Sequence, residues 1–323
     1  VLLISAPTFG QENTTKSKQK TSSINIKQIE YHGWKDSILI SNGQVEAVIV
    51  PAIGRVMQFR FVGEEDGPFW ENRTLDGQSV DPESNTWMNF GGDKSWPAPQ
   101  SEWPKIAKRG WPPPAGFDSS VTEPRIERDF VELTSPVDRS FGIRVVRRIE
   151  LDPKAPVMRI KTTYEKATGE PNEISVWVIT QLKDPLGIFV PLPKKSIFPE
   201  GYTKQSEQLP EGFKVEKELI SLTRDTRKST KFGTDSGTLL WIGEKHALRI
   251  DSERLSGAIY PDNGSSAEVY TNAVSAQPYI ELEMLGPLKV MRASDSIEST
   301  SIYTLLRRTQ SDVAAEAKKI LKR

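Results

Sequence analysis

Two glutamates and a tyrosine alternate near the C-terminal end of the sequence, at a spacing that suits acid–base chemistry. Tyr279, Glu281 and Glu283 are separated by the apolar residues Ile280 and Leu282. Side chains alternate between the two faces of a strand, so both carboxylates and the phenol share one face. A carboxylate serves as a general acid or base only where its surroundings tune its pKa. The alternative is a pair of solvent-facing glutamates on a half-buried strand.

The composition restricts the other chemistry that the chain can perform. The sequence has no cysteine and only two histidines, His32 and His246. This excludes disulfides, thiolate nucleophiles, cysteine-based metal sites and a histidine-rich metal centre. A phosphate-binding glycine loop and a nucleophile elbow are also missing, so we expect no cofactor and no such metal. A calcium site made of carboxylates and carbonyl oxygens stays open.

Charge and size indicate a globular protein with a small-molecule partner. The 43 Lys and Arg balance the 43 Asp and Glu, which argues against a nucleic acid or an anionic membrane as partner. The 323 residues include eight Trp, seven Tyr and twelve Phe, enough for a substantial core.

The N-terminal residues predict export. In residues 1–11 a short apolar run is followed by small and turn residues, as in the rear part of a signal peptide, with cleavage expected near Phe9 to Gln11. Residues 12–24 are polar and read as a flexible spacer. The expected location is the periplasm or the outside of the cell. An ordinary edge strand is the alternative, and the run is too short to span a membrane.

Residues 25–308 predict a single all-β domain, and residues 309–323 an amphipathic helix capped near Asp312. The domain alternates between short β-rich segments and turns, without the helices of a parallel α/β fold, which favours an antiparallel sandwich or barrel. The expected strands are Ser37–Ile40, Val45–Val50, Val56–Val62, Phe130–Thr134, Ile143–Leu151, Val157–Tyr164, Ile174–Leu182, Lys214–Leu222, Thr238–Ile242, Ala247–Asp251, Ala267–Thr271, Tyr279–Met284 and Ser301–Leu306.

One segment departs from this strand pattern. Residues 66–118 are rich in Trp, Pro, Gly and Asn, and they hold five of the eight tryptophans. So long a segment without regular structure is either disordered or a functional elaboration, and five tryptophans argue against disorder. We expect ordered loops packed over one face of the sheet.

Several phrases of the sequence resemble the galactose mutarotase-like superfamily. Ile40–Phe59 is similar to its opening strands, and Tyr279–Leu288 to its closing pair. Three further phrases resemble a bacterial branch of that superfamily whose function is uncharacterised; they are Gly91–Gln100 with Trp111–Pro114, Tyr260–Asp262 and Glu268–Asn272. The resemblance covers about residues 25 to 308. It implies an antiparallel β-supersandwich.

The same resemblance implies a catalytic glutamate but does not supply its usual partner. Characterised mutarotases use a glutamate as general base and a histidine as general acid, and Glu283 matches the glutamate. The strand comparable to the one near the family histidine, Ser175–Leu182, contains none, and His32 and His246 read as surface or structural residues. An acid would have to come from Lys94, Tyr260 or Glu281.

Sugar recognition is the leading hypothesis for the function. Aromatic faces pack against the C–H patches of a pyranose, while converging polar groups bind its hydroxyls. Arg55 and Lys94 could also bind a uronate carboxylate, although Arg55 could instead bind its neighbouring turn, Asp262 could be a turn residue, and any tryptophan could be buried. The binding candidates are Arg55, Lys94, Trp96, Gln100, Trp103, Trp111, Trp177, Gln181, Tyr260, Asp262 and Glu281, with Glu283 as the candidate base. The competing hypotheses are an aldose-epimerase-type enzyme that uses Glu283, and an envelope scaffold without sugar binding.

Overall fold

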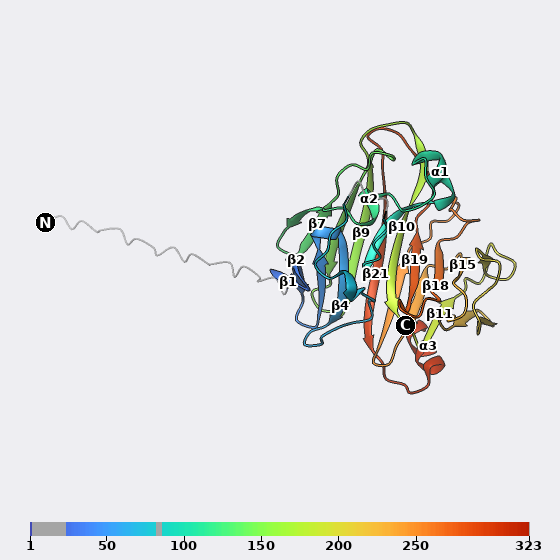
Figure 1. Ribbon diagram of the computed structural model, residues 1–323. Helices are drawn as coiled ribbons and strands as arrows, with labels where there is room; N and C mark the ends of the chain where they lie inside the picture. The colour runs from blue at the N-terminus through green and yellow to red at the C-terminus, as the bar shows by residue number, and fades with distance from the viewer. Residues whose placement is uncertain (2–23, 82–85, 323) are drawn as a thin grey trace.

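Two antiparallel β-sheets pack face to face in the computed structural model, which describes residue 1, residues 24–81 and residues 86–322 (Figure 1). The predicted signal-peptide remnant and spacer fall almost wholly in residues 2–23, outside the described residues. The strands begin at Asn25 and end at Arg307. The fold class is therefore the all-β sandwich that the alternation predicts.

In the described residues the first sheet has eleven strands and the second has ten. The first sheet contains, in spatial order, β1 (Asn25–Tyr31), β2 (Trp34–Ser41), β3 (Val45–Val50), β4 (Arg55–Phe61), β5 (Asp93–Ala98), β10 (Asn172–Lys183), β19 (Tyr279–Leu285), β18 (Ala267–Thr271), β15 (Thr230–Thr234) and β12 (Thr203–Lys204), with β20 (Lys289–Met291) paired to β10. The second contains β13 (Lys214–Glu216), β14 (Leu219–Leu222), β11 (Gly187–Pro191), β16 (Thr238–Ile242), β17 (His246–Ser252), β21 (Ser296–Arg307), β9 (Val157–Lys166), β8 (Ile143–Leu151), β7 (Phe130–Thr134) and β6 (Glu123–Ile126).

Most expected strands are present, and five of them, β3, β7, β8, β16 and β18, have the predicted bounds. One expectation needs correction. The segment Lys214–Leu222 is a hairpin of β13 and β14 rather than one strand, because the chain turns at Lys217, whose φ is 58°.

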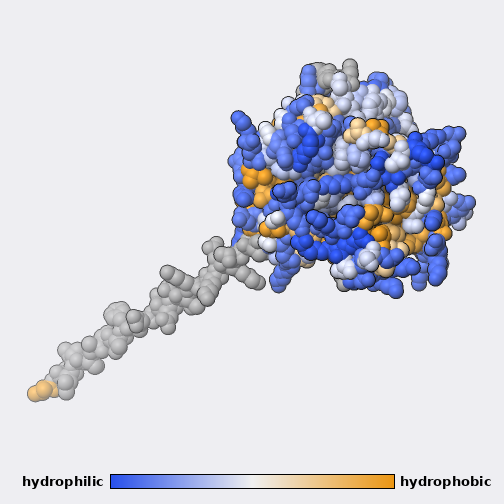
Figure 2. Space-filling view, turned by 60° about the horizontal axis from the view of Figure 1, so that its bottom comes forward, coloured by the Kyte–Doolittle hydropathy of each residue, from blue (hydrophilic) through white to orange (hydrophobic). Residues whose placement is uncertain are grey.

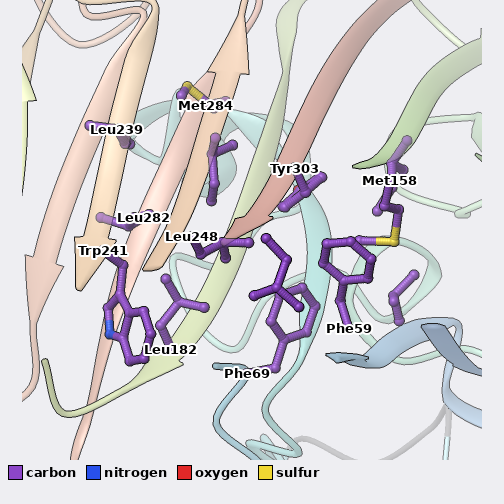
Figure 3. Close-up of a cluster of buried hydrophobic side chains, with 14 of the residues drawn as sticks. Phe59, Phe69, Met158, Leu182, Leu239, Trp241, Leu248, Leu282, Met284 and Tyr303 are labelled. Atoms are coloured by element: carbon purple, nitrogen blue, oxygen red, sulfur yellow. The ribbon is translucent and has the colours of Figure 1, made fainter. Parts of the chain in front are cut away.

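The core lies between the sheets and is built from the inward-facing residues of both. Figure 3 shows Phe59, Phe69 and Leu282 from the first sheet and its connections converging on Met158 and Leu248 from the second. All five are fully buried or nearly so. Packing of this kind holds the first sheet rigidly, so its outer face can position side chains.

A cluster of polar side chains also crosses this interior, which we call the inner cluster: Asp93, Arg147, Thr180 and Tyr303. Arg147 of β8 forms an ion pair with Asp93 of β5 and donates to its backbone oxygen at 3.0 Å. Thr180 Oγ1 and Tyr303 OH donate to Asp93 Oδ2 at 2.7 and 2.6 Å. Among the described residues, no buried polar side-chain atom of this cluster lacks a hydrogen-bond partner.

The tryptophan-rich segment 66–118 is not made of loops alone. Its residues 93–98 form β5, which pairs with β10 along its whole length. The strand was hidden because it contains Pro97 and no β-branched residue. Pro97 is tolerated because β5 pairs with β4 only through Asp93 and Val56, which leaves the rest of that edge without a strand partner. Two short helices follow, α1 (Trp103–Ile106) and α2 (Ala115–Asp118).

The C-terminal helix is α3 (Val313–Leu321), a little shorter than the predicted segment 309–323. The Asp312 side chain caps it by accepting a hydrogen bond from the Ala315 backbone at 2.6 Å. Ala317 and Ile320 pack against Leu240 and neighbouring residues of the second sheet. In Figure 1, α3 and α1 lie at opposite ends of the molecule.

The surface is largely hydrophilic on the face seen in Figure 2, where hydrophobic residues form several separate patches. None of the helices in the described part of the chain combines the length and apolar character needed to cross a membrane. The same residues contain no group of three or more His, Asp or Glu side chains arranged to hold a metal ion.

Candidate functional site

A cavity of about 440 Å³ lies on the outer face of the first sheet. Its floor is formed by alternate residues of neighbouring strands, because residues in register on adjacent strands project from the same face. Lys231 is paired with Tyr270, Tyr270 with Glu281, and Glu281 with Gln181. The described residues that line the cavity are Trp87, Trp96, Gln100, Trp111, Trp177, Lys231, Tyr270, Asn272, Val274, Gln277, Tyr279, Glu281 and Glu283.

Aromatic rings form most of the wall. Trp96 of β5 and Trp177 of β10 are paired across the two strands, with ring centroids 5.4 Å apart in an edge-to-face arrangement. Trp87 and Trp111 extend the group, with centroids 5.0 Å apart. Trp111 is 49% exposed and forms the rim. Tyr279 also lines the cavity.

Charged residues on the floor form an outer cluster: Lys94, Lys231, Glu268, Glu281 and Glu283. Lys231 Nζ lies 2.5 Å from Glu268 Oε2 and 2.8 Å from Glu283 Oε2. The Trp177 indole donates to the same Glu283 oxygen at 2.6 Å. Gln181 donates to Glu281 Oε1 at 2.8 Å, and Lys94 Nζ lies 3.6 Å from that oxygen.

Several buried polar atoms of this floor lack hydrogen-bond partners among the described residues. They include Lys94 Nζ, Gln181 Oε1 and Glu283 Oε1. Leaving a buried donor or acceptor unsatisfied costs about 1–3 kcal/mol. The floor of the cavity therefore carries hydrogen-bonding capacity that the protein itself does not use.

Burial and neighbouring charges shift the ionisation of the outer cluster. Burial raises the pKa of Glu283 well above its ordinary value; Lys231 opposes this, and Glu268 and Glu281 add to it. Burial also lowers the pKa of Lys94. For Lys231, burial acts to lower the pKa, but the carboxylates of Glu268 and Glu283 outweigh it and raise the pKa. Because Oε2 of Glu283 accepts from Trp177 and contacts Lys231, Oε1 is the oxygen left for a ligand.

Six of the predicted site residues line the cavity: Trp96, Gln100, Trp111, Trp177, Glu281 and Glu283. Gln181 and Lys94 lie in the floor beneath them and contact Glu281. Lys94 is 1% exposed, so it supports the cavity wall rather than forming part of it.

Four predicted residues are not brought to the cavity wall. Arg55 is fully buried and donates to Gly91 O, to Asp118 Oδ1 and to Ser119 Oγ. A glycine is required at position 91, because its φ is 92° and a Cβ there would lie 2.2 Å from Trp70 O. Trp103 is also buried, and its indole donates a hydrogen bond to Pro97 O.

The other two, Tyr260 and Asp262, belong to a separate loop. Tyr260 lines a different cavity of about 690 Å³, where its hydroxyl accepts a hydrogen bond from the Leu255 backbone. Asp262 is a turn residue with a φ of 50°. Although that cavity is larger, no described residue lining it carries an unsatisfied buried side-chain atom. The cavity above Glu283 is therefore the better candidate.

Sequence reasoning missed several residues of this site. The phrase Glu268–Asn272 had been noted, and the alternation of Glu268 and Tyr270 along β18 could have assigned both to one face. Lys231 gave no such signal, because β15 contains Gly233 and was not expected as a strand. Trp87 lay in the segment expected to be looped.

Comparison with solved structures identifies the architecture. A putative aldose 1-epimerase from Klebsiella pneumoniae subsp. pneumoniae MGH 78578 superimposes with a TM-score of 0.57 over 93% of this chain and 87% of that chain, at 11% identity. A galactose mutarotase-like protein from Lactobacillus casei ATCC 334 gives 0.55 over 83% and 99%, at 10% identity. This chain has the galactose mutarotase-like fold.

The same fold also matches part of a longer protein. A TPR-domain-containing protein from Parabacteroides distasonis ATCC 8503 matches with a TM-score of 0.56 at 12% identity. The match covers 86% of this chain and 48% of that chain, so the present chain spans about half of its length. No family model matches the sequence, and no curated protein matches it either. The resemblance to the galactose mutarotase-like superfamily is thus confirmed for the fold, while the assignment to one bacterial branch stays a prediction.

Proposed function

We propose that this galactose mutarotase-like protein binds a carbohydrate in the cavity above Glu283. The observation that carries the proposal is the coincidence of an aromatic wall with unsatisfied polar atoms in the floor. The rings of Trp96, Trp111 and Trp177 line the cavity and offer apolar contact to the C–H patches of a pyranose, and Glu283 Oε1 and Gln181 Oε1 lie unpaired within or beside the cavity floor. A polyhydroxylated ligand satisfies both kinds of surface.

The proposed binding depends on aromatic rings that are held in place. Asp118 Oδ1 accepts a hydrogen bond from the Trp96 indole at 2.7 Å, and the same oxygen accepts one from Arg55 at 3.0 Å. Arg55 and Lys94 keep the pKa of Asp118 below its ordinary value, although burial opposes them. The role of Arg55 in this proposal is thus to position Trp96 through Asp118.

Binding to a glycan array tests the proposal directly. The wild-type protein is expected to bind one or more glycans, and Trp177→Ala is expected to lose most of that binding because it removes a platform and a donor to Glu283. Glu298→Gln is a matched control, since Glu298 lies on the second sheet and pairs with Lys161. Absence of binding by the wild-type protein to every glycan would leave the envelope scaffold as the remaining hypothesis.

An acid–base enzyme is the second candidate, and the raised pKa of Glu283 together with its free Oε1 favours it. A glutamate whose pKa is raised suits a general acid better than the general base expected from the sequence. Its activity would be lost as pH rises through the raised pKa. Glu283→Gln separates the candidates: a loss of turnover much larger than the loss of glycan affinity indicates an enzyme, whereas absence of turnover in the wild-type protein indicates a binding module.

Export from the cytoplasm remains part of the proposal on the strength of the apolar run in residues 1–11. Mapping the N-terminus of the secreted protein tests it, with cleavage expected near Gln11. A protein that stays in the cytoplasm with its leader intact would contradict it.

A further inference from the structure

The charges that face the cavity offer no free cation to an acidic ligand. Among the described lining residues, the charged side chains are Lys231, Glu281 and Glu283. Lys231 is already in contact with two carboxylates, Glu268 and Glu283. An anionic sugar would therefore approach these carboxylates and find no described lining cation that is free to pair with it.

The two cations that the sequence offered for a uronate do not line the cavity. The Arg55 guanidinium is fully buried and paired with Asp118, and Lys94 lies beneath Glu281 rather than at the cavity wall. Recognition of a carboxylate is strongest where a guanidinium presents two parallel donors. No described residue on the wall presents such a fork.

The same wall is suited to a positive charge. Ring faces attract cations, and the protein's own ammonium groups already use them: Lys231 Nζ lies 4.3 Å from the Trp177 ring centroid, and Lys94 Nζ lies 4.8 Å from that of Trp96. Trp111 lines the cavity as well and is 49% exposed, so its ring presents free surface to a ligand.

Glu281 is the carboxylate best placed to meet such a charge. Its side chain is 11% exposed, against 1% for Glu283, and its partners Gln181 and Lys94 both contact Oε1. Glu283 has its Oε2 engaged by Trp177 and Lys231. A positively charged group entering the cavity therefore meets Glu281 first.

We propose that the cavity selects amino sugars in their ammonium form over neutral sugars, and neutral sugars over uronates, with Glu281 as the residue that receives the ammonium group. This rests on the proposed carbohydrate binding and deepens it by naming the ligand class. The aromatic wall supplies a cation-attracting surface, and the outer cluster supplies three carboxylates against two lysines.

Calorimetric titration with two sugar scaffolds in three charge states tests the order. The probes are glucosamine and galactosamine, glucose and galactose, and glucuronate and galacturonate, at a pH where the amines are protonated. On the better-bound scaffold, the amine is expected to bind at least fivefold more tightly than the neutral sugar, and the uronate at least fivefold more weakly. Added salt should reduce the preference, since the contrast is electrostatic.

The substitution Glu281→Gln tests the assigned residue. The ratio of amine to neutral-sugar affinity is expected to fall below twofold in this variant and to stay at the wild-type value in the control Glu298→Gln. A uronate that binds as well as the neutral sugar, or an amine that shows no preference in the wild-type protein, overturns the inference even if Glu281→Gln fails to fold. Absence of binding by all six probes and by a glycan array would overturn the proposed function itself and this inference with it.

Discussion

The inner cluster lies between the two sheets and the outer cluster lies on the outer face of the first sheet. Both bury charged side chains, yet they differ in how their polar atoms are satisfied. In the inner cluster, Asp93 is bound by Arg147, Thr180 and Tyr303, and no buried side-chain atom among these described residues is left without a partner. In the outer cluster, Lys94 Nζ and Glu283 Oε1 are left without hydrogen bonds next to a cavity.

The difference in hydrogen bonding suggests a criterion for buried charges. A charge whose polar atoms are all satisfied supports the fold, whereas one with unsatisfied atoms beside a cavity is a candidate for ligand binding. Asp93 and Arg147 balance each other in charge. The outer cluster has three carboxylates and two lysines, and burial, with a smaller contribution from Glu268 and Glu281, raises the pKa of Glu283 against the opposing effect of Lys231. Both clusters are buried, so burial does not distinguish them. The unsatisfied atoms and the unbalanced charge make the outer cluster the candidate functional site.

The largest effect is expected when the inner cluster is broken. Asp93→Ala leaves Arg147 buried without its carboxylate, which should lower the free energy of unfolding by about 3–5 kcal/mol. Urea denaturation measures the change. Glu298→Ala, which breaks an exposed pair with Lys161, is the control and should change the free energy by less than about 0.5 kcal/mol. A loss below about 1 kcal/mol in Asp93→Ala would remove the contrast between the clusters.

The next largest effect is expected from the ionisation of Asp262, which interacts with Glu268 and Lys231 of the outer cluster. Burial, followed by the nearby Glu268, raises the pKa of Asp262 to about 6 from an ordinary value of 3.8, while Lys231 opposes this. A carboxyl whose pKa is raised on folding stabilises the protein while protonated, and the stabilisation is lost as pH rises through the folded-state pKa.

The unfolding free energy of the wild type should therefore fall relative to Asp262→Asn by about 2 kcal/mol between pH 4 and pH 7. Asparagine does not titrate and tolerates the positive φ at this position, so the variant isolates the charge. Urea denaturation of both proteins across this range provides the measurement. Parallel pH profiles would mean that folding does not raise the pKa of Asp262.

A substitution in the outer cluster should affect binding more than stability. Glu283→Gln removes one of three clustered carboxylates while keeping an oxygen that can accept from the Trp177 indole. Sugar affinity is expected to fall about tenfold, or about 1.4 kcal/mol, while the free energy of unfolding changes by less than about 1 kcal/mol. Calorimetry and urea denaturation on the same samples give both values. A stability loss as large as that of Asp93→Ala would assign Glu283 to the fold instead.

The smallest effect is expected at the rim of the cavity. Trp111→Ala removes a half-exposed ring, so sugar affinity should fall about threefold, or about 0.7 kcal/mol, with the unfolding free energy nearly unchanged. Trp111→Phe keeps a ring face and should retain most of the affinity in the same titration. Equal affinity of all three proteins would place the sugar deeper, against Trp96 and Trp177.

The fold and part of the site could be predicted from the sequence because both depend on local alternation. The face shared by Glu281 and Glu283 follows from their spacing alone, as does the strand β18. The strand β5 could not be found this way, because Pro97 and the absence of β-branched residues disguise it. The partners of Arg55 and Lys231 lie far away in the chain, so no local pattern could show that one is closed off by Asp118 and the other bridges Glu268 and Glu283.

The strand β10 places Thr180 in the inner cluster and Trp177 and Gln181 at the outer one, on alternate positions of a single twelve-residue segment. Point substitutions at the outward positions can therefore change the ligand while the interior stays untouched. A one-residue insertion or deletion within the strand would exchange the two faces and disturb both at once. Divergence of ligand preference on this scaffold should thus proceed by exchange of single outward residues, with the length of β10 held constant.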